Sequence, residues 1–402
     1  MKRHYELTID ENYCNFWGIE DSAREFFQNS YDEEVQNPES KSFYFYDEES
    51  HVLCIGNKNA TLKAETLLLG SSSKISDDDT IGNFGEGYKI ATLVALRSGH
   101  PVVICNPGAN EVWTSRFVKS KKYGGRKILA FDVESSLNIK DKLFYKKNKG
   151  NDYSLCIEIH NIFEDQFKKI VSQNLNLQKS ICPEKFKIIS TSYGDIILEG
   201  SKSSIYVSGL YINEDDKLNY SYDIKPKFLK LGRDRKMADS FLRRETTSKM
   251  WIEAIFNNKE DEELLQKFYD LINNSEFSDL SSCSSMITIN SSCNFSSMYK
   301  ECSFVSDKLK EMFIENNVGC APVYDEDSKR RMEIFGNKIS FVSRQMYDIL
   351  ISNSDNSLFE IKKDKTLYER YETLLNSLRE FMTESQKNEC DDLLERSRFL
   401  LS

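Results

Sequence analysis

The order of apolar and polar residues predicts the elements of about the first 160 residues. Residues 23–34 and 88–97 have the spacing of amphipathic or buried helices, and residues 62–69 read as a shorter one. Strand patterns open the chain, within residues 1–20, and fill residues 42–55, where polar residues 48–50 supply a hairpin turn. Further strands are predicted at 101–106, 111–118, 127–133 and 153–159. This order favours a two-layer α/β sandwich with a mixed sheet.

The rest of the chain divides into three stretches. Residues 165–272 begin with a helical linker at 164–176 and continue with strands and an Arg-rich helix, which predicts a second α/β domain. Residues 273–297 are rich in Ser and Asn and read as a linker. Residues 298–402 predict a small α/β and helical region. Within it we expect one long helix at 362–384, whose short heptad seam packs on its own domain.

Composition narrows the class of protein. The 402 residues carry a net charge of −10 and 39% hydrophobic residues, enough for two or three domains with real cores. The 10 cysteines include no C-x-x-C and the 4 histidines no zinc-type spacing, so we expect reduced, mostly buried thiols. No signal peptide and no membrane span are evident, and we expect a cytoplasmic protein.

Three polar residues of the first helix stand out. Glu25, Asn29 and Asp32 are spaced four and three apart, so they share one stripe of the helix. A carboxylate can take a proton from water, and an amide oxygen one turn away can hold Mg²⁺. The alternative is an amphipathic helix with a solvated acidic face.

A glycine cluster precedes the helix at 88–97. Gly82, Gly85 and Gly87 form G-x-x-G-x-G, which lets the backbone approach a ligand while the helix start offers free N–H groups. This arrangement predicts a phosphate cradle, although it is neither a P-loop nor a dinucleotide-binding fingerprint. The polar stretch 70–80 fits a lid, from which Lys74 could reach a phosphate.

Together these stretches resemble the GHKL ATPases, which have a Bergerat nucleotide-binding fold. Residues 25–33, E-F-F-Q-N-S-Y-D-E, resemble the first box of that superfamily, and residues 72–87 resemble the phosphate box of its MutL and MORC members. The resemblance covers about the first 160 residues. It implies that ATP and Mg²⁺ are bound, with Glu25 catalytic, Asn29 on the metal, and Asp32, Lys89 and Ser154 at the nucleotide.

One box departs from the family. The superfamily has D-x-G-x-G where residues 52–62 read V-L-C-I-G-N-K-N-A-T-L, which puts Asn57 in place of the Asp that receives the adenine amino group. Asn59 and Thr61 then replace the two glycines. An amide oxygen can still accept from the adenine, but its NH₂ needs another partner. If this register is right, we expect Asn57→Asp to tighten ATP binding; otherwise residues 55–61 are only a strand and a turn.

Two further groups of cations are candidates for weaker roles. In the family, a second, transducer domain sends a Lys or Arg to the γ-phosphate, which implies Lys230, Arg233 or Arg235 here, with a surface ion-pair cluster as the alternative. Two basic runs, which could touch nucleic-acid phosphates, are more simply solvated hairpin loops. These runs are Lys119, Lys121, Lys122, Arg126 and Lys127, and Lys140, Lys142, Lys146, Lys147 and Lys149.

The sequence therefore indicates an ATP-binding protein, a slow ATPase that acts as a conformational switch. The resemblance also implies a nucleotide-dependent homodimer and a protein client. The alternative is a non-hydrolysing, nucleotide-regulated interaction module in a phage or anti-phage assembly. Binding of nucleic acid is possible but not favoured.

Overall fold

The computed structural model describes residues 2–67, 87–135, 154–229, 231, 240–291, 296–334, 337–352 and 367–401. The chain forms two compact units, which are described separately. The first comprises residues 1–258 and 276–282, and the second comprises 259–275 and 283–402. Among the described residues, no helix has both the length and the apolar character that a bilayer span requires.

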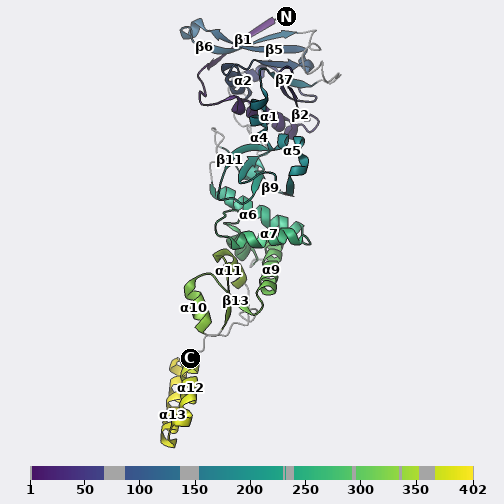
Figure 1. Cartoon of the computed structure of the whole chain (residues 1–402). Coiled ribbons are helices and arrows are strands. Elements are labelled where there is room, and N and C mark those ends of the chain that lie inside the picture. Colours follow the sequence, from purple (N-terminus) through teal and green to yellow (C-terminus); the bar gives the residue numbers. More distant parts are fainter. Residues whose placement is uncertain are drawn as a thin grey trace. The chain divides into compact units, whose positions relative to one another are not determined.

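A seven-stranded sheet forms the N-terminal part of the first unit (Figure 1). Its order is β1-β6-β5-β4-β7-β3-β2, and each neighbouring pair is antiparallel, so the expectation of a mixed sheet was wrong. The cause is that β7 inserts between β3 and β4 and runs against both, while the other neighbours are mostly hairpins. The strands are β1 (Lys2–Asp10), β2 (Ser42–Asp47), β3 (Val52–Asn57), β4 (Val102–Asn106), β5 (Glu111–Lys119), β6 (Lys127–Ser135) and β7 (Leu155–Ile159).

Helices α1 (Ile19–Gln36) and α2 (Gly87–Arg97) cover one face of this sheet (Figure 1). Ala23, Phe26 and Phe27 of α1 are buried, as the amphipathic pattern requires. The two helices also pack on each other, where the Ser22 hydroxyl donates to the Ala91 carbonyl at 2.8 Å. A two-layer α/β sandwich is therefore confirmed. Short 3₁₀ turns η1 (Ala64–Leu67), η2 (Pro107–Ala109) and η3 (Lys121–Tyr123) complete it.

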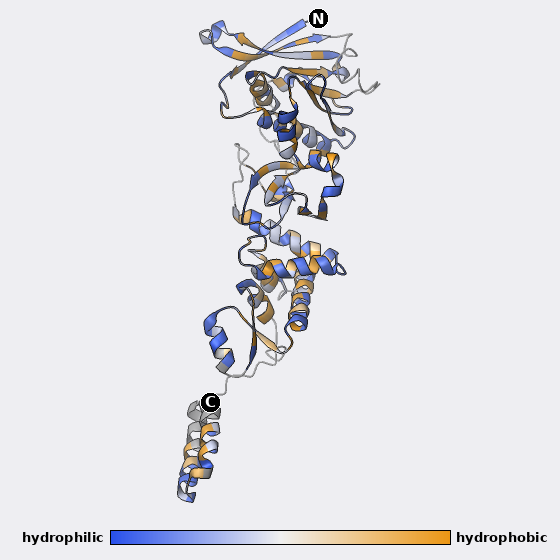
Figure 2. Ribbon diagram, viewed as in Figure 1, coloured by the Kyte–Doolittle hydropathy of each residue, from blue (hydrophilic) through white to orange (hydrophobic). Residues whose placement is uncertain are grey.

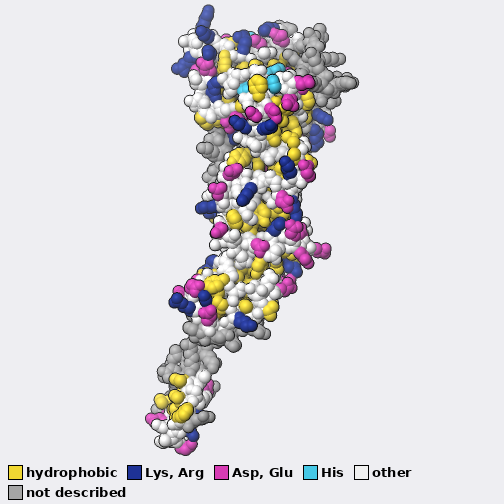
Figure 3. Space-filling model, in the orientation of Figure 1, with side chains coloured by type: hydrophobic (Ala, Val, Ile, Leu, Met, Phe, Trp, Pro, Cys, Tyr) yellow, Lys and Arg dark blue, Asp and Glu magenta, His cyan; other side chains and the backbone are white. Residues whose placement is uncertain are grey.

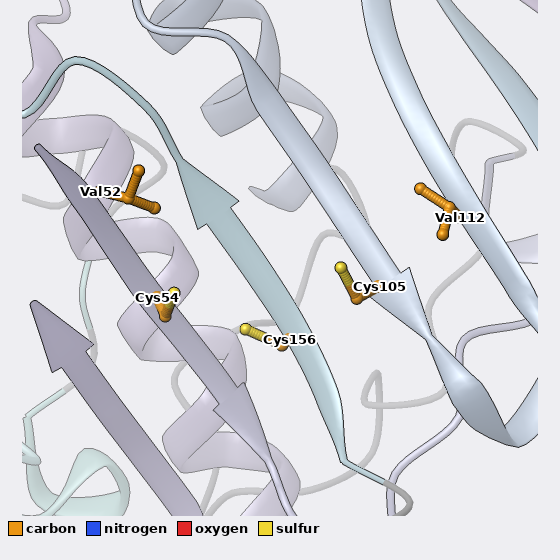
Figure 4. Close-up of a cluster of buried hydrophobic side chains, with 5 residues drawn as sticks. All are labelled: Val52, Cys54, Cys105, Val112 and Cys156. Carbon is orange, nitrogen blue, oxygen red and sulfur yellow. The ribbon is translucent and has the colours of Figure 1, made fainter. Parts of the chain in front are cut away.

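The other face of the sheet carries a cluster of small apolar side chains. Cys54, Cys105 and Cys156 come from β3, β4 and β7 and are fully buried, with Val52 and Val112 beside them (Figure 4). Burial raises the pKa of the Cys156 thiol well above its usual value. The Cys156 thiol is therefore a protonated packing group rather than a nucleophile.

Arg97, at the end of α2, fixes the loop that leads into α1. Its guanidinium donates to four backbone carbonyls of that loop, at 2.9 to 3.2 Å. Hydrogen bonds from a charged donor are stronger than neutral ones, so this single side chain holds the loop's path. The acceptors belong to Glu11, Tyr13, Cys14 and Trp17.

A five-stranded sheet follows within the first unit, in the order β11-β10-β12-β9-β8. The predicted strand at 204–212 is two strands, because Ser208 and Gly209 adopt φ values of 50° and 81° and turn the chain back. Strand β8 was not predicted. The elements are α4 (Glu164–Ser172), α5 (Leu175–Ile181), η5 (Pro183–Lys185), β8 (Lys187–Thr191), β9 (Gly194–Glu199), β10 (Ser204–Val207), β11 (Leu210–Glu214), β12 (Ser221–Ile224), η6 (Pro226–Phe228) and α6 (Ser240–Asn257).

The two sheets of the first unit are connected through Tyr31 of α1. Its hydroxyl donates to Asn174 Oδ1 at 3.1 Å and accepts from Asn174 Nδ2 at 3.0 Å. Asn174 is itself buried and caps α5 by accepting from the Leu177 N–H at 3.2 Å. The helix that carries Glu25 and Asn29 is thus bonded directly to the start of the second α/β part.

The second unit is largely helical, as predicted, with one parallel pair of strands, β13 and β14. Its helices carry both hydrophobic and hydrophilic residues along their length (Figure 2). Its elements are α7 (Glu262–Asn273), α8 (Cys283–Ser291), α9 (Tyr299–Asn316), β13 (Cys320–Val323), α10 (Glu326–Ile334), β14 (Lys338–Phe341), α11 (Arg344–Ile351), α12 (Leu367–Leu378), η7 (Arg379–Phe381) and α13 (Glu384–Leu401).

Two predictions about this region were wrong. The Ser/Asn-rich stretch is not irregular throughout: residues 283–291 form α8, because Cys283 and Ile287 are buried where α8 packs on α9 and α11. The predicted helix at 362–384 ends near 381, and α13 starts a new one. Thr383 and Gln386 form a capping box there, since the Thr383 N–H donates to Gln386 Oε1 at 3.0 Å and the Gln386 N–H to Thr383 Oγ1 at 3.4 Å.

Candidate functional site

The packing of α1 on α2 brings together residues from both predicted boxes. Gly87 is the first residue of α2, and a Cβ placed on it would lie 2.8 Å from Glu25 Oε2 and 3.3 Å from Asn29 Nδ2. The carboxylate, the amide and the glycine backbone therefore meet at one point, although Asn29 and Gly87 are 58 positions apart in the sequence. Any side chain at position 87 would have to displace one of the other two groups.

The Asn29 side chain is held by its own helix. Its Nδ2 donates to the Glu25 carbonyl at 2.7 Å, and the side chain is only partly buried. This bond orients the amide and leaves Oδ1 as its acceptor atom. One such oxygen suits a Mg²⁺ site that is completed by substrate phosphates and water, which is the usual way proteins hold this ion. Among the described residues, no group of three or more Asp, Glu, His or Cys side chains is arranged so that it could hold a metal ion.

Three charged residues of the two helices are buried. Glu25 is 0% exposed, Asp32 2% and Lys89 0%. Gly87 and Lys89 both belong to the first turn of α2, where backbone N–H groups lack partners within the helix and the helix dipole favours an anion. The stripe predicted on α1 is therefore not a solvated acidic face, because its two carboxylates are inside the protein.

Asn57 is the last residue of β3, and both N–H groups of its side-chain amide are hydrogen-bonded. Its Nδ2 donates to the Ser30 carbonyl at 2.8 Å and to the Ser40 carbonyl at 2.9 Å, and the residue is 4% exposed. Ser30, one residue after Asn29, also donates its hydroxyl to the Gly56 carbonyl at 2.9 Å. The end of β3 is thus fastened to α1, with Asn57 Oδ1 as the remaining acceptor of the amide.

Two residues that follow Asn57 stand at the positions where the predicted register replaces glycines. Asn59, aligned with the first glycine of the family, has φ of 55°, a left-handed conformation that Gly adopts freely and Asn tolerates. Thr61, aligned with the second glycine, packs against Gly108, where a Cβ would lie 2.0 Å from Thr61 Oγ1. Ser154 is 1% exposed and directly precedes Leu155, the strand partner of Asn57.

One residue at this site, Asn106, was not predicted from the sequence. Asn106 is fully buried at the end of β4 and clamps the backbone of Leu62: its Nδ2 donates to the Leu62 carbonyl at 2.7 Å and its Oδ1 accepts from the Leu62 N–H at 3.2 Å. This fixes the segment that follows Asn57. A polar residue that ends an otherwise apolar strand was the only signal in the sequence.

Six predicted site residues lie outside the described residues. They are Lys74, Gly82, Gly85, Lys230, Arg233 and Arg235. Their predicted roles therefore stay predictions.

Two sequence comparisons find similarity to proteins of Mycoplasma pneumoniae. A family model described as the N-terminal domain of Mycoplasma pneumoniae MPN635 matches residues 171–258, which include the five-stranded sheet. An uncharacterized protein of Mycoplasma pneumoniae is 27% identical over 249 residues, which span 58% of this chain and 90% of that protein.

Similar solved structures include two type II topoisomerases. The ATPase region of Saccharomyces cerevisiae topoisomerase II matches with a TM-score of 0.30 and 12% identity, over 48% of this chain and 62% of that structure. The ATPase and transducer domains of topoisomerase II from Balamuthia mandrillaris match with a TM-score of 0.32 and 11% identity, over 66% and 75%. This chain thus spans less than two thirds of the yeast structure, and neither match is close enough to carry an activity over.

Proposed function

We propose that residues 1–164 bind Mg-ATP and hydrolyse it slowly, in the manner of the GHKL ATPases. The observation that supports this most is the meeting of Glu25, Asn29 and Gly87 at the start of α2. A general base, a ligand for a hard cation and an approachable backbone at a helix N-terminus are the parts that phosphoryl transfer requires.

In this proposal each residue has one role. When bound, Mg-ATP supplies the phosphoanhydride bond and the metal charge. Glu25 orients and deprotonates the attacking water, and Asn29 Oδ1 coordinates the metal. The N–H groups of the first turn of α2 and the Lys89 ammonium face the phosphates. Asn57 Oδ1 accepts from the adenine amino group.

The same site is proposed to act on the second α/β part through Tyr31. Tyr31 lies two residues from Asn29 on α1, and burial raises the pKa of its phenol, which stays a neutral hydrogen-bond donor to Asn174. A shift of α1 on nucleotide binding would therefore move the cap of α5. In this proposal the conformational switch is the movement of α5 that follows from the shift of α1. Nucleotide-dependent pairing of two chains belongs to the same proposal.

The role of Glu25 is tested by Glu25→Gln, which keeps the shape of the side chain and removes the base. We expect turnover to fall by roughly 10²–10⁴-fold, the usual contribution of a general base, with ATP affinity retained. Steady-state phosphate release and calorimetry measure the two quantities. Glu33→Gln on the same helix is the control. Equal phosphate release by wild type and Glu25→Gln would rule out hydrolysis at this site and leave a nucleotide-regulated binding module.

The role of Gly87 is tested by a graded pair of substitutions. The Cβ of Gly87→Ala meets the movable end of Glu25, so we expect lower turnover with little loss of affinity. Gly87→Val also crowds Asn29, and we expect binding of a non-hydrolysable ATP analogue to weaken by roughly 10- to 100-fold, the scale of overpacking costs. Gly18→Ala, at the start of α1, is the control for a glycine change at a helix end. Undiminished affinity in folded Gly87→Val would exclude the cradle.

Asn57→Asp is now expected to destabilise the protein rather than tighten ATP binding. The new carboxylate would place an oxygen against the Ser30 and Ser40 carbonyls in place of two donated hydrogen bonds. We expect a loss of about 3–5 kcal/mol of unfolding free energy at pH 8, as when a buried charge is left unpaired.

The loss should depend on pH in a defined direction. The carboxyl at position 57 is disfavoured as an anion, so its folded-state pKa exceeds its unfolded value, and stability is lost as pH rises through that folded-state pKa. Urea titrations at pH 5 and pH 8 measure this, with Asn59→Asp, on an exposed residue, as the matched control. Wild-type stability for Asn57→Asp at pH 8 would contradict the hydrogen bonding of Asn57.

Tyr31→Phe tests the coupling without touching the site. It removes the hydroxyl bonded to Asn174, so we expect near-normal phosphate release but loss of the nucleotide-dependent change in amide exchange of α5 and β11. Tyr44→Phe is the control, because Tyr44 also bonds α5, through Ser180 Oγ at 3.3 Å, but belongs to β2. If Tyr31→Phe and wild type show the same exchange response to the ATP analogue, Tyr31 does not transmit the switch.

A further inference from the structure

The turn between β5 and β6 concentrates positive charge on an otherwise acidic chain. Residues 119–127 contain five cations, all exposed, and the cross-strand pair that closes the hairpin is Lys119 opposite Lys127. Like charges placed directly opposite each other cost stability, and at Lys127 this cost is offset by an ion pair with Glu11 at 3.0 Å. Among the described residues, no carboxylate lies within ion-pair distance of Lys119, Lys121 or Lys122. Figure 3 shows Lys and Arg side chains gathered at the end of the sheet where Figure 1 labels β6.

An aromatic ring accompanies these cations. Tyr123 is 39% exposed at the tip of the turn, with Lys122 Nζ 5.4 Å from its ring centroid. The turn is held by its own backbone, since the Ser120 N–H donates to the Arg126 carbonyl at 2.9 Å and the Gly125 N–H to the Ser120 carbonyl at 2.9 Å. The ring is thus presented on a fixed loop, which makes a stacking platform of low entropic cost.

A cavity of about 410 Å³ opens beside Tyr123. It is lined by Thr8, Asp10, Tyr123, Arg126 and Ile128, so an aromatic ring, an aliphatic side chain, a carboxylate and a guanidinium line the same space. The hydrogen bond from the Asn12 N–H, at 3.0 Å to Asp10 Oδ1, lowers the pKa of Asp10, and the carboxylate is ionised at neutral pH. Arg126 lies 3.7 Å from its other oxygen.

The cavity and the lysines of the turn would bind different parts of one ligand. Asp10 and Arg126 offset each other's charge in the cavity, whereas the exposed lysines on the turn attract a phosphate. The cavity instead suits a flat group with N–H donors, stacked on Tyr123. Paired bases in a duplex cannot reach such a cavity, and the carboxylates of an acidic peptide accept hydrogen bonds but donate none.

We propose that the β5–β6 turn binds single-stranded nucleic acid, with phosphates on Lys119, Lys121 and Lys122 and one base stacked on Tyr123 in the cavity. Because Asp10 accepts hydrogen bonds, bases that carry an amino group, such as cytosine and adenine, are preferred over thymine and uracil. This surface is separate from the proposed nucleotide site and does not depend on it.

Fluorescence anisotropy of the full chain with labelled single strands of about 12 nucleotides, oligo(dC) and oligo(dT), tests the proposal. We expect tighter binding of oligo(dC). Tyr123→Ala should weaken it by roughly 5- to 100-fold, the usual effect of losing one stacked base, whereas Tyr123→Phe should bind like wild type. Asp10→Asn should remove the preference for oligo(dC), because an amide can also donate to thymine.

The salt dependence separates specific contacts from general attraction. Replacing Lys121 and Lys122 together by Ala should reduce the slope of log K against log[salt] by about 1.4, since each lost single-strand phosphate contact contributes about 0.7. Replacing the exposed Lys185 and Lys202 by Ala removes the same charge and should leave the slope unchanged. Equal losses in the two double variants would overturn the proposal. Binding that survives the turn variants but is lost in Gly87→Val would also overturn it, because the strand would then occupy the nucleotide site.

Discussion

The close approach of α2 to α1 at Gly87 is the constraint on which the candidate site depends. The absence of a side chain there allows a helix N-terminus to lie against a buried carboxylate and an oriented amide. Ser22, which donates to the Ala91 carbonyl, joins the same two helices one turn further along α2. The position of Glu25 relative to the first turn of α2 therefore follows from how the two helices pack, at Gly87 and at the hydrogen bond between Ser22 and Ala91.

Buried asparagines connect the elements around this pair of helices. Asn57 ties the end of β3 to α1, Asn106 ties β4 to Leu62, and Asn174 ties α5 to Tyr31. In each case a side-chain amide satisfies hydrogen-bonding groups that the sheet or helix leaves over at its end. An amide offers both donors and an acceptor, which a carboxylate does not, so an Asp at position 57 could not make the two hydrogen bonds that Asn57 donates to Ser30 and Ser40.

The central strands of the N-terminal sheet differ sharply in their surroundings from the turn between β5 and β6. These strands are buried on both faces, with thiols and valines on the face away from α1 and α2. The turn between β5 and β6 instead exposes five cations and an aromatic ring. The net charge of −10 hides this local concentration, because composition averages over a surface on which charges are not evenly distributed.

The sequence by itself determined the local features of this protein. The strands of the first sheet, helices α1 and α2, and the residues Glu25, Asn29 and Gly87 follow from short-range periodicity and motif spacing, which depend on neighbours within a few residues. Only the tertiary structure decided the rest. Strand β7 lies antiparallel between β3 and β4, and residues 283–291 are helical. Asn57 donates its two hydrogen bonds to the Ser30 and Ser40 carbonyls. All three features depend on groups that are distant in the sequence. Periodicity states which face of an element is apolar, but it does not state which distant carbonyl or helix will meet that face, and that meeting sets the chemistry of the site.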